Sequence, residues 1–239
     1  MVRMPLIEVT DLTKRYGSRV AVDGVSFTVD RGEIFGILGT NGAGKTTTVE
    51  CLQGLRTADS GTIRVLGLDP VKQRDALRQR LGSQLQESTL PAKLKVREAL
   101  ELFASFYPSP ADVEVLLDRL ALTEHADSYF GKLSGGQKQR VSIALALIGN
   151  PEVAVLDELT TGLDPHARRD TWQLVERVRD AGVTVLLVTH FMDEAERLCD
   201  RVAIFDTGRV VATGTPSELR ATTSKSTLDD AFVTLTGRD

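Results

Sequence analysis

The sequence predicts an α/β fold with a mainly parallel core sheet, a small N-terminal antiparallel β subdomain and an inserted α-helical subdomain. Three observations lead to this class. Compact apolar runs alternate with helical stretches, which is typical of parallel sheets covered on both faces. One such run enters a glycine-rich loop at residue 39. Residues 96–148 show helical periodicity with almost no strand pattern.

The antiparallel part is expected near the N-terminus. Residues 25–29 alternate apolar and polar side chains, and residues 30–32 follow them as a turn. This period of two indicates a strand with one buried face. Together with residues 7–12 and 61–66, it predicts a small sheet that is largely antiparallel.

Four apolar runs predict the strands of the parallel core: residues 34–38, 153–156, 183–188 and 202–205. A helix over residues 45–55 is expected to follow the first of them. Parallel sheets place ligands at the carboxyl ends of their strands. The side chains that follow these runs are therefore the candidates for chemistry.

Helical periodicity dominates the middle third of the chain. Its apolar residues at helical spacing are Val96, Leu100, Phe103, Val113, Leu116, Leu117 and Leu120. Prolines at positions 91, 108 and 110 punctuate these helices. We expect a main domain over residues 1–220, with a helical subdomain of about residues 87–148 inserted in it, and a short C-terminal tail or helix over residues 221–239.

The composition fits a folded protein and argues against several classes. Of 239 residues, 41% are hydrophobic and 26% are charged, which argues against disorder. The net charge of -4 gives no positive field for a polyanion, so we expect no nucleic-acid partner. The longest apolar runs, residues 143–148 and 185–188, are far shorter than the roughly 20 residues of a spanning helix. Cys51 and Cys199 are expected to be buried free thiols.

The glycine-rich loop fits the nucleotide-binding pattern G-x-x-x-x-G-K-[ST] between a strand and a helix. The predicted nucleotide-binding residues are Gly39, Thr40, Asn41, Gly42, Ala43, Gly44, Lys45, Thr46 and Thr47. Glycines let the backbone wrap phosphates, Lys45 supplies charge to the β- and γ-phosphates, and the Thr46 hydroxyl can bind Mg²⁺. A glycine turn that only caps a helix would not explain the lysine and threonine.

Two acids follow the run at residues 153–156. We expect Asp157 to face Mg²⁺ at the phosphates, and Glu158 to lie where a base can orient or polarise the attacking water. The alternative is a solvated acidic loop. The intact phosphate loop makes that alternative the weaker interpretation.

His190 closely follows the run at residues 183–188, and we expect it at the same sheet edge as Asp157. We expect it to sense the γ-phosphate as a hydrogen-bond donor. A histidine without such a context is usually a packing or surface residue. We therefore interpret His125 and His166 as packing or surface residues.

Gln86 and Tyr16 complete the predicted site. Gln86 is a candidate to contact Mg²⁺ or the attacking water and to relay the state of the site to the helical insertion. Gln84 competes for this role, and a surface amide is the alternative for both. Tyr16 precedes Gly17 in a predicted loop near the first strand; it is expected to stack on adenine, with half-buried scaffold as the alternative.

A second phosphate-binding element is the pentapeptide Leu-Ser-Gly-Gly-Gln at residues 133–137. Ser134 is a good N-cap, Gly135 and Gly136 leave backbone N–H groups open to a ligand, and Gln137 completes the element. Two phosphate cradles are more than one triphosphate needs within a monomer. The pattern therefore points to an ATPase whose sites are closed by a second copy.

In this order, the motifs resemble the ATP-binding subunit of ATP-binding cassette (ABC) transporters. The resemblance extends from Tyr16 to Thr189-His190 and covers nearly the whole chain. It implies a P-loop NTPase core, ATP and Mg²⁺ as cofactors, and a head-to-tail homodimer or pseudo-dimer. The pentapeptide of one protomer would close on ATP held by the other, with Asp164 lying across the interface. Hydrolysis would reopen the dimer and drive a separate integral membrane permease.

A finer resemblance, to daunorubicin-type multidrug exporter ATPases, comes from residues 189–196, 198–202, 208–212 and 214–216. It implies a peripheral protein on the cytoplasmic face of the cell membrane that drives export of drugs or other hydrophobic compounds. The alternative is a soluble ABC-type ATPase acting in translation or DNA maintenance without a permease. A phosphate-loop kinase or GTPase does not account for the pentapeptide.

Two residues depart from the family pattern. Thr40 replaces the proline usual after the first loop glycine, at a position that contributes mainly backbone. Leu159 replaces the proline that commonly follows the catalytic glutamate, so the turn carrying Glu158 is expected to be less rigid. The predicted catalytic residues are all present, and we still expect hydrolysis.

Overall fold

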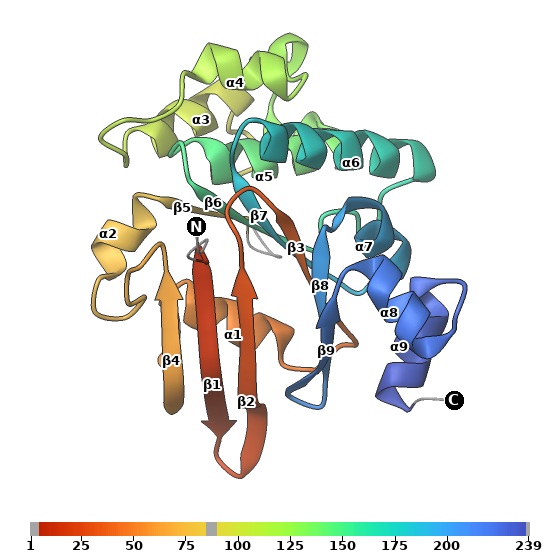
Figure 1. Ribbon diagram of the computed structural model, residues 1–239. Helices are drawn as coiled ribbons and strands as arrows, with labels where there is room; N and C mark the ends of the chain where they lie inside the picture. Colours follow the sequence, from red (N-terminus) through yellow and green to blue (C-terminus); the bar gives the residue numbers. More distant parts are fainter. Residues whose placement is uncertain (1–4, 85–89, 238–239) are drawn as a thin grey trace. The chain divides into compact units, whose positions relative to one another are not determined.

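The computed structural model describes residues 5–84 and 90–237 and confirms the predicted α/β class (Figure 1). The chain forms two compact units. The first consists of Met1–Arg78 and Leu186–Asp239, and the second of Gln79–Val185. The boundary between the units falls within strand β7 (Thr184–Thr189).

The first unit begins with a three-stranded antiparallel sheet in the order β2-β1-β4. Strand β1 (Ile7–Tyr16) pairs antiparallel with both β2 (Arg19–Val29) and β4 (Ser60–Val65). Toward the end of β2, buried and exposed side chains alternate strictly. This is the pattern that the period of two predicted for a strand with one face on the core.

Tyr16 ends strand β1 and pairs with Arg19, so its predicted position in a loop is wrong. A turn of two residues, Gly17 and Ser18, joins the strands. Gly17 has a φ of 59°, in the left-handed region that tight hairpin turns require and glycine adopts readily. Such a short turn lets the pairing of the two strands continue up to Tyr16.

The same unit contains strands of the mainly parallel sheet, hydrogen-bonded in the order β7-β3-β8-β9. Strand β3 (Ile34–Gly39) runs parallel to β8 (Arg201–Asp206), and β8 runs antiparallel to β9 (Arg209–Gly214). Side chains along β3 and β7 are buried throughout, as expected of strands covered on both faces. Strand β9 was not predicted.

Five helices of the first unit have these bounds: α1 (Lys45–Leu52), α2 (Arg74–Arg78), α7 (Met192–Leu198), α8 (Pro216–Thr223) and α9 (Leu228–Thr236). Helix α1 ends before the predicted residue 55, because Gly54 has a φ of 67° and terminates the helix in the left-handed conformation. Helices α8 and α9 pack on each other and on β9 (Figure 1).

The second unit pairs β5 (Leu81–Gln84) in parallel with β6 (Val153–Asp157). Its helices are α3 (Val96–Ala104), α4 (Val113–Arg119), η1 (Thr123–His125), η2 (Phe130–Lys132), α5 (Gly135–Leu147) and α6 (Pro165–Asp180). Most residues of the predicted helical pattern are buried, including Val96, Leu100 and Leu117. Helix α5 packs on β5 and β6, which gives the unit its core.

Both cysteines are buried free thiols, as predicted. Burial raises the pKa of the Cys51 thiol and raises that of Cys199 well above its ordinary value. The neutral thiol is a poor nucleophile, so neither cysteine has the chemistry of a reactive site. Within residues 5–84 and 90–237, none of the helices has the length and apolar character needed to cross a bilayer.

Candidate nucleotide-binding and catalytic site

The phosphate loop connects β3 to α1 in the first unit. Gly39 and Gly44 have φ values of 157° and 99°. A Cβ atom on either residue would lie 2.5 Å from a backbone carbonyl oxygen, that of Phe205 or that of Ala21 respectively. Only glycine fits at these two positions without moving the backbone. The two glycines are therefore required by the path of the loop itself.

Lys45 is the first residue of α1 and is 6% exposed. Its Nζ donates to the carbonyl oxygens of Gly39, at 2.7 Å, and of Thr40, at 3.1 Å. Buried ammonium groups need such partners. The charge thus lies over the loop beside the N-terminus of α1, where backbone N–H groups and the helix dipole also favour an anion.

A cavity of about 280 Å³ borders the phosphate loop in the first unit. It is lined by Gly39, Thr40, Asn41, His190, Met192, Asp229 and Phe232. His190 reaches it because β7 and β3 are neighbours in the sheet and both end at this edge. The structure thus brings the predicted phosphate sensor together with the start of the loop. Asp229 and Phe232, from α9, were not predicted.

Four of the predicted nucleotide-binding residues differ in exposure. Asn41 and Gly42 are exposed in the loop, Thr46 is exposed on the first turn of α1, and Thr47 is half-buried.

Arg19, which was not predicted, lies near the loop. Its Nη2 is 3.5 Å from the position that a Cβ on Gly42 would take. The hairpin brings this arginine to the loop. No local pattern in the sequence indicates such a contact.

Tyr16 is 41% exposed at the end of β1. Two cations lie beside its ring: Lys14 Nζ is 5.8 Å and Arg56 Cζ 5.4 Å from the ring centroid. An exposed ring of this kind can stack on another planar group. Stacking on adenine stays a prediction.

The two predicted acids lie in the second unit. Asp157 ends β6 and is 9% exposed, and the half-buried Glu158 follows it with a φ of 50°. A non-glycine residue in this conformation costs about 1–2 kcal/mol, and such strain clusters at functional sites. Leu159, in place of the expected proline, is fully buried. Its side chain belongs to the buried core, and the lower rigidity expected of this turn stays a prediction.

Gln86 and Gln84 are the two candidates for a contact with Mg²⁺ or the attacking water. Gln86 lies outside the described residues. Gln84 is the last residue of β5 and its side chain is buried. The reading of Gln84 as a surface amide is therefore wrong, because β5 pairs with β6 and carries it into the core of the second unit.

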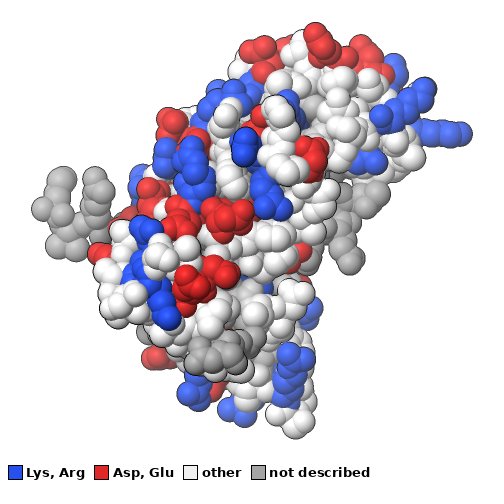
Figure 2. Space-filling model, turned by 90° about the vertical axis from the view of Figure 1, so that its right-hand side faces the viewer, with Lys and Arg blue, Asp and Glu red and all other residues white. Residues whose placement is uncertain are grey.

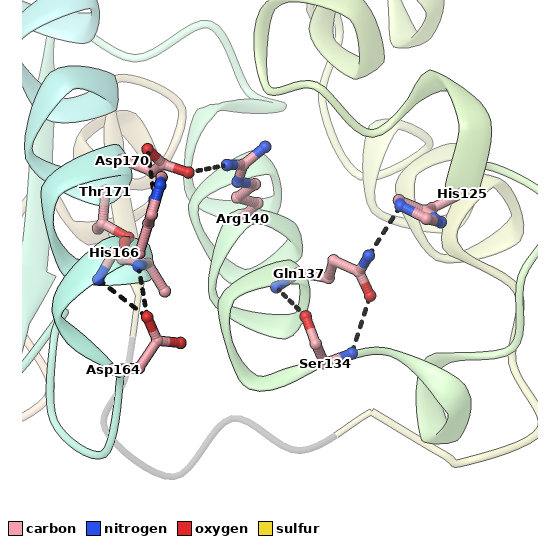
Figure 3. A network of polar contacts seen from close by, with 9 residues as sticks. His125, Ser134, Gln137, Arg140, Asp164, His166, Asp170 and Thr171 are labelled. Carbon is pink, nitrogen blue, oxygen red and sulfur yellow. Dashed lines mark hydrogen bonds and ion pairs between the residues drawn. The ribbon is translucent and has the colours of Figure 1, made fainter.

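The pentapeptide begins helix α5 of the second unit, with Ser134 as the predicted N-cap (Figure 3). Ser134 Oγ accepts from the Gln137 N–H at 3.3 Å, and Gln137 Oε1 accepts from the Ser134 N–H at 2.8 Å. This reciprocal pair is a capping box. Gly136 follows in the first turn, and a Cβ there would lie 3.3 Å from the Cβ of Ala167, so the small residue permits a close approach of α5 to α6.

A cavity of about 360 Å³ lies at this helix start, within the second unit. Its lining consists of residues 134–137, residues 162–164, Ala121, His125, Arg140, His166, Ala167 and Asp170. The structure thus brings Ser134, Gly135, Gly136 and Gln137 together with Asp164. Asp170 accepts from Arg140 at 3.2 Å, which ties α6 to α5 beside the cavity (Figure 3).

Asp164 is the N-cap of α6. Its Oδ1 accepts from the N–H groups of Ala167, at 3.0 Å, and His166, at 2.9 Å. These two hydrogen bonds lower the pKa of Asp164, because they favour the carboxylate. The residue therefore presents a negative charge to the cavity at neutral pH.

The two remaining histidines differ. His166 has a side chain that is 91% exposed, in keeping with a surface residue. His125 lines the cavity and its Nε2 is 2.8 Å from Gln137 Nε2. His125 is half-buried, so its interpretation as a packing residue still stands, but its contact with a residue of the pentapeptide was not predicted. Sequence reasoning missed it because twelve positions separate the two residues.

Comparisons with known proteins agree with the fold and the motifs. The family model described as ABC transporter matches residues 22–161. The Nod factor export ATP-binding protein I of Burkholderia lata is 45% identical over 219 residues, which cover 89% of this chain and 72% of the relative.

Solved structures are similar over nearly the whole chain. One described as the ATP-binding subunit of an ABC transporter has a TM-score of 0.85 and 32% identity, covering 97% of this chain and 99% of the other. A dimeric ATP-binding cassette in a post-hydrolysis state, bound to ADP and Pi, has a TM-score of 0.77 and 26% identity, covering 87% of this chain and 98% of the other. Family model, relative and structures agree: the chain belongs to the ABC transporter family, as an ATP-binding domain.

Proposed function

We propose that this chain is the ATP-binding and ATP-hydrolysing subunit of an ABC exporter, and that it dimerises on ATP to drive a separate integral membrane permease. One observation carries the proposal. Each unit has an anion-binding helix start with its own cavity: the phosphate loop with His190 in the first, and the pentapeptide with Asp164 in the second. A single chain therefore carries both halves of a site that two copies would close.

ATP would be held by the phosphate loop, with Tyr16 on the adenine. The buried Lys45 ammonium and the start of α1 suit the β- and γ-phosphates. When bound, Mg²⁺ would neutralise phosphate charge. Its proposed ligands, Thr46, Asp157 and Gln86, offer the oxygen atoms that this ion prefers.

The proposed ligand set has a single carboxylate, that of Asp157, which suits Mg²⁺ bound together with a nucleotide. Among the residues that the structure describes, no group of three or more His, Cys, Asp or Glu side chains could hold a metal ion. Mg²⁺ commonly takes one or two protein ligands and completes its coordination with water and phosphate oxygens. A nucleotide-dependent Mg²⁺ site is what these residues support.

In the proposed reaction, Glu158 accepts a proton from the attacking water or orients it, and His190 donates a hydrogen bond to the γ-phosphate. The left-handed φ of Glu158 supports its role, because a strained conformation is kept where the direction of a side chain matters. The position of His190 beside Gly39 and Thr40 supports the role of sensor.

The dimer is proposed as a head-to-tail homodimer or pseudo-dimer in which residues 134–137 of one protomer close on ATP bound to the other, with Asp164 across the interface. The similarity to a dimeric cassette supports it. Residues 1–220 would form the ATP-binding domain and 221–239 its tail. The helical subdomain of about residues 87–148 would transmit the motion to the permease.

Export is supported by the name of the relative from Burkholderia lata, which is an export ATP-binding protein. We further propose the daunorubicin-type cargo class, drugs or other hydrophobic compounds, from the residues that resemble such exporters, and a place on the cytoplasmic face of the membrane. Nucleic acid is not a proposed partner. On the face shown in Figure 2, Lys and Arg lie interspersed with Asp and Glu instead of forming one positive field.

Affinity purification of the tagged chain from detergent-solubilised cells tests the transporter role. We expect a hydrophobic integral membrane protein to co-purify, because the proposed dimer drives a separate membrane permease. A mock purification from cells with the untagged chain is the control. Recovery with ribosomes or DNA, and without a membrane protein, would instead support the permease-independent ATPase.

A further inference from the structure

The side chain of Gln137 is held at both ends of its amide group. Gln137 Oε1 accepts from the backbone N–H of Ser134 at 2.8 Å. On the other side, Gln137 Nε2 is 2.8 Å from His125 Nε2 (Figure 3). His125 belongs to the short η1 turn, whereas Gln137 belongs to the first turn of α5. The contact therefore ties a separate turn to the capping box of α5.

The polarity of this contact follows from its partners. A backbone N–H only donates, so the amide oxygen of Gln137 must face Ser134. The amide nitrogen must then face His125, and it too only donates. His125 Nε2 is therefore the acceptor, and a neutral His125 carries its proton on Nδ1. No other assignment satisfies both hydrogen bonds at once.

We propose that His125 is a positioning residue for the pentapeptide: as a hydrogen-bond acceptor, it fixes the amide of Gln137 and so keeps the capping box of α5 closed. The proposal rests on the proposed function, in which the start of α5 receives a nucleotide phosphate. A Gln137 side chain without this partner is free to turn, and the Ser134 N–H then loses its acceptor. The first turn of α5 opens more often, and its N–H groups lose their common direction.

A matched pair of substitutions separates hydrogen bonding from packing. His125→Gln places an acceptor oxygen at about the reach of Nε2, whereas His125→Met has a similar length without a comparable acceptor. His166→Met is the control, because His166 lines the same cavity but has a 91% exposed side chain. Only His125→Met removes the acceptor that Gln137 needs.

Two measurements on the isolated chain test the contact itself. NMR of the imidazole nitrogens is expected to show the Nδ1–H tautomer for His125. Hydrogen exchange of the Ser134 N–H is expected to become about fivefold faster in His125→Met, as loss of one neutral hydrogen bond predicts, and to stay near the wild-type rate in His125→Gln and His166→Met. The Nε2–H tautomer, or equal exchange in the Met and Gln variants, would overturn the proposal.

A third measurement connects the contact to function. In the Glu158→Gln background with ATP and Mg²⁺, His125→Met is expected to weaken dimerisation about fivefold per site without changing ATP affinity, and His125→Gln is expected to restore it. Equal dimer affinity in the two variants overturns the proposal and leaves the proposed function standing. If the Glu158→Gln chain itself does not dimerise, the proposed function fails, and the tautomer and exchange results still decide whether His125 positions the capping box.

Discussion

Replacing Glu158 with glutamine is expected to lower the steady-state rate of ATP hydrolysis by about 10²- to 10⁴-fold, the range that a general base contributes. The amide has nearly the shape of the carboxylate but cannot accept the proton of the attacking water. ATP binding is expected to persist, because the phosphate loop is unchanged. ATP should then accumulate in the closed dimer. Phosphate release measures the first effect and size-exclusion chromatography with ATP the second.

Glu152→Gln is the matched control for this variant. Glu152 precedes β6, at the opposite end of the strand from Glu158, and its carboxylate pairs with Arg80 at 2.7 Å. Loss of this partly exposed ion pair costs about 0.2–1 kcal/mol of stability and should leave turnover unchanged. A Glu158→Gln chain that hydrolyses ATP at the wild-type rate would remove Glu158 from its proposed role.

Ser134→Arg is expected to abolish ATP-dependent dimerisation while leaving nucleotide binding intact. The substitution removes the Oγ acceptor of the capping box, worth about 1 kcal/mol. It also puts a long cationic side chain into the cavity at the start of α5, where the helix dipole disfavours positive charge. Titration with a fluorescent ATP analogue measures binding, and sizing chromatography measures the dimer.

Ser109→Arg provides the same chemical change at an exposed position of the second unit. It should bind nucleotide and dimerise like the unchanged chain. Thermal unfolding of both variants checks that they are folded. Undiminished ATP-dependent dimerisation of the Ser134→Arg chain would show that the pentapeptide does not lie at the dimer interface.

Much of the fold could be predicted because burial leaves strong patterns. The continuous apolar runs became β3, β6, β7 and β8, and the alternating run became part of β2. Of the missed strands, β5 has only four residues, and the side chains of β9 are exposed or only partly buried along its length. Neither strand therefore has an apolar pattern that distinguishes it from the neighbouring sequence. The early end of α1 and the extension of β1 to Tyr16 depend on glycines at turns. These glycines determine where an element ends, but not whether it is a helix or a strand.

The site was predicted unevenly, for a physical reason. The local geometry of a motif can be predicted when its residues are adjacent in sequence, as in the phosphate loop and in the pentapeptide with its N-cap Ser134. Contacts between distant segments do not. The position of Arg19 beside the loop depends on strand pairing. The position of Asp229 in the cavity that His190 also lines depends on helix packing. The bond between His125 and Gln137 depends on where a separate turn lies against α5.

The most direct measurement is the ATPase rate per molecule of the purified chain across a wide range of protein concentrations. Since each catalytic site is proposed to need a helix start from a second copy, the specific activity is predicted to fall steeply once dilution separates the protomers. Light scattering at the same concentrations should show the loss of dimer in parallel. Full activity in a strictly monomeric sample, unchanged on dilution, would contradict the proposal that two copies form each catalytic site.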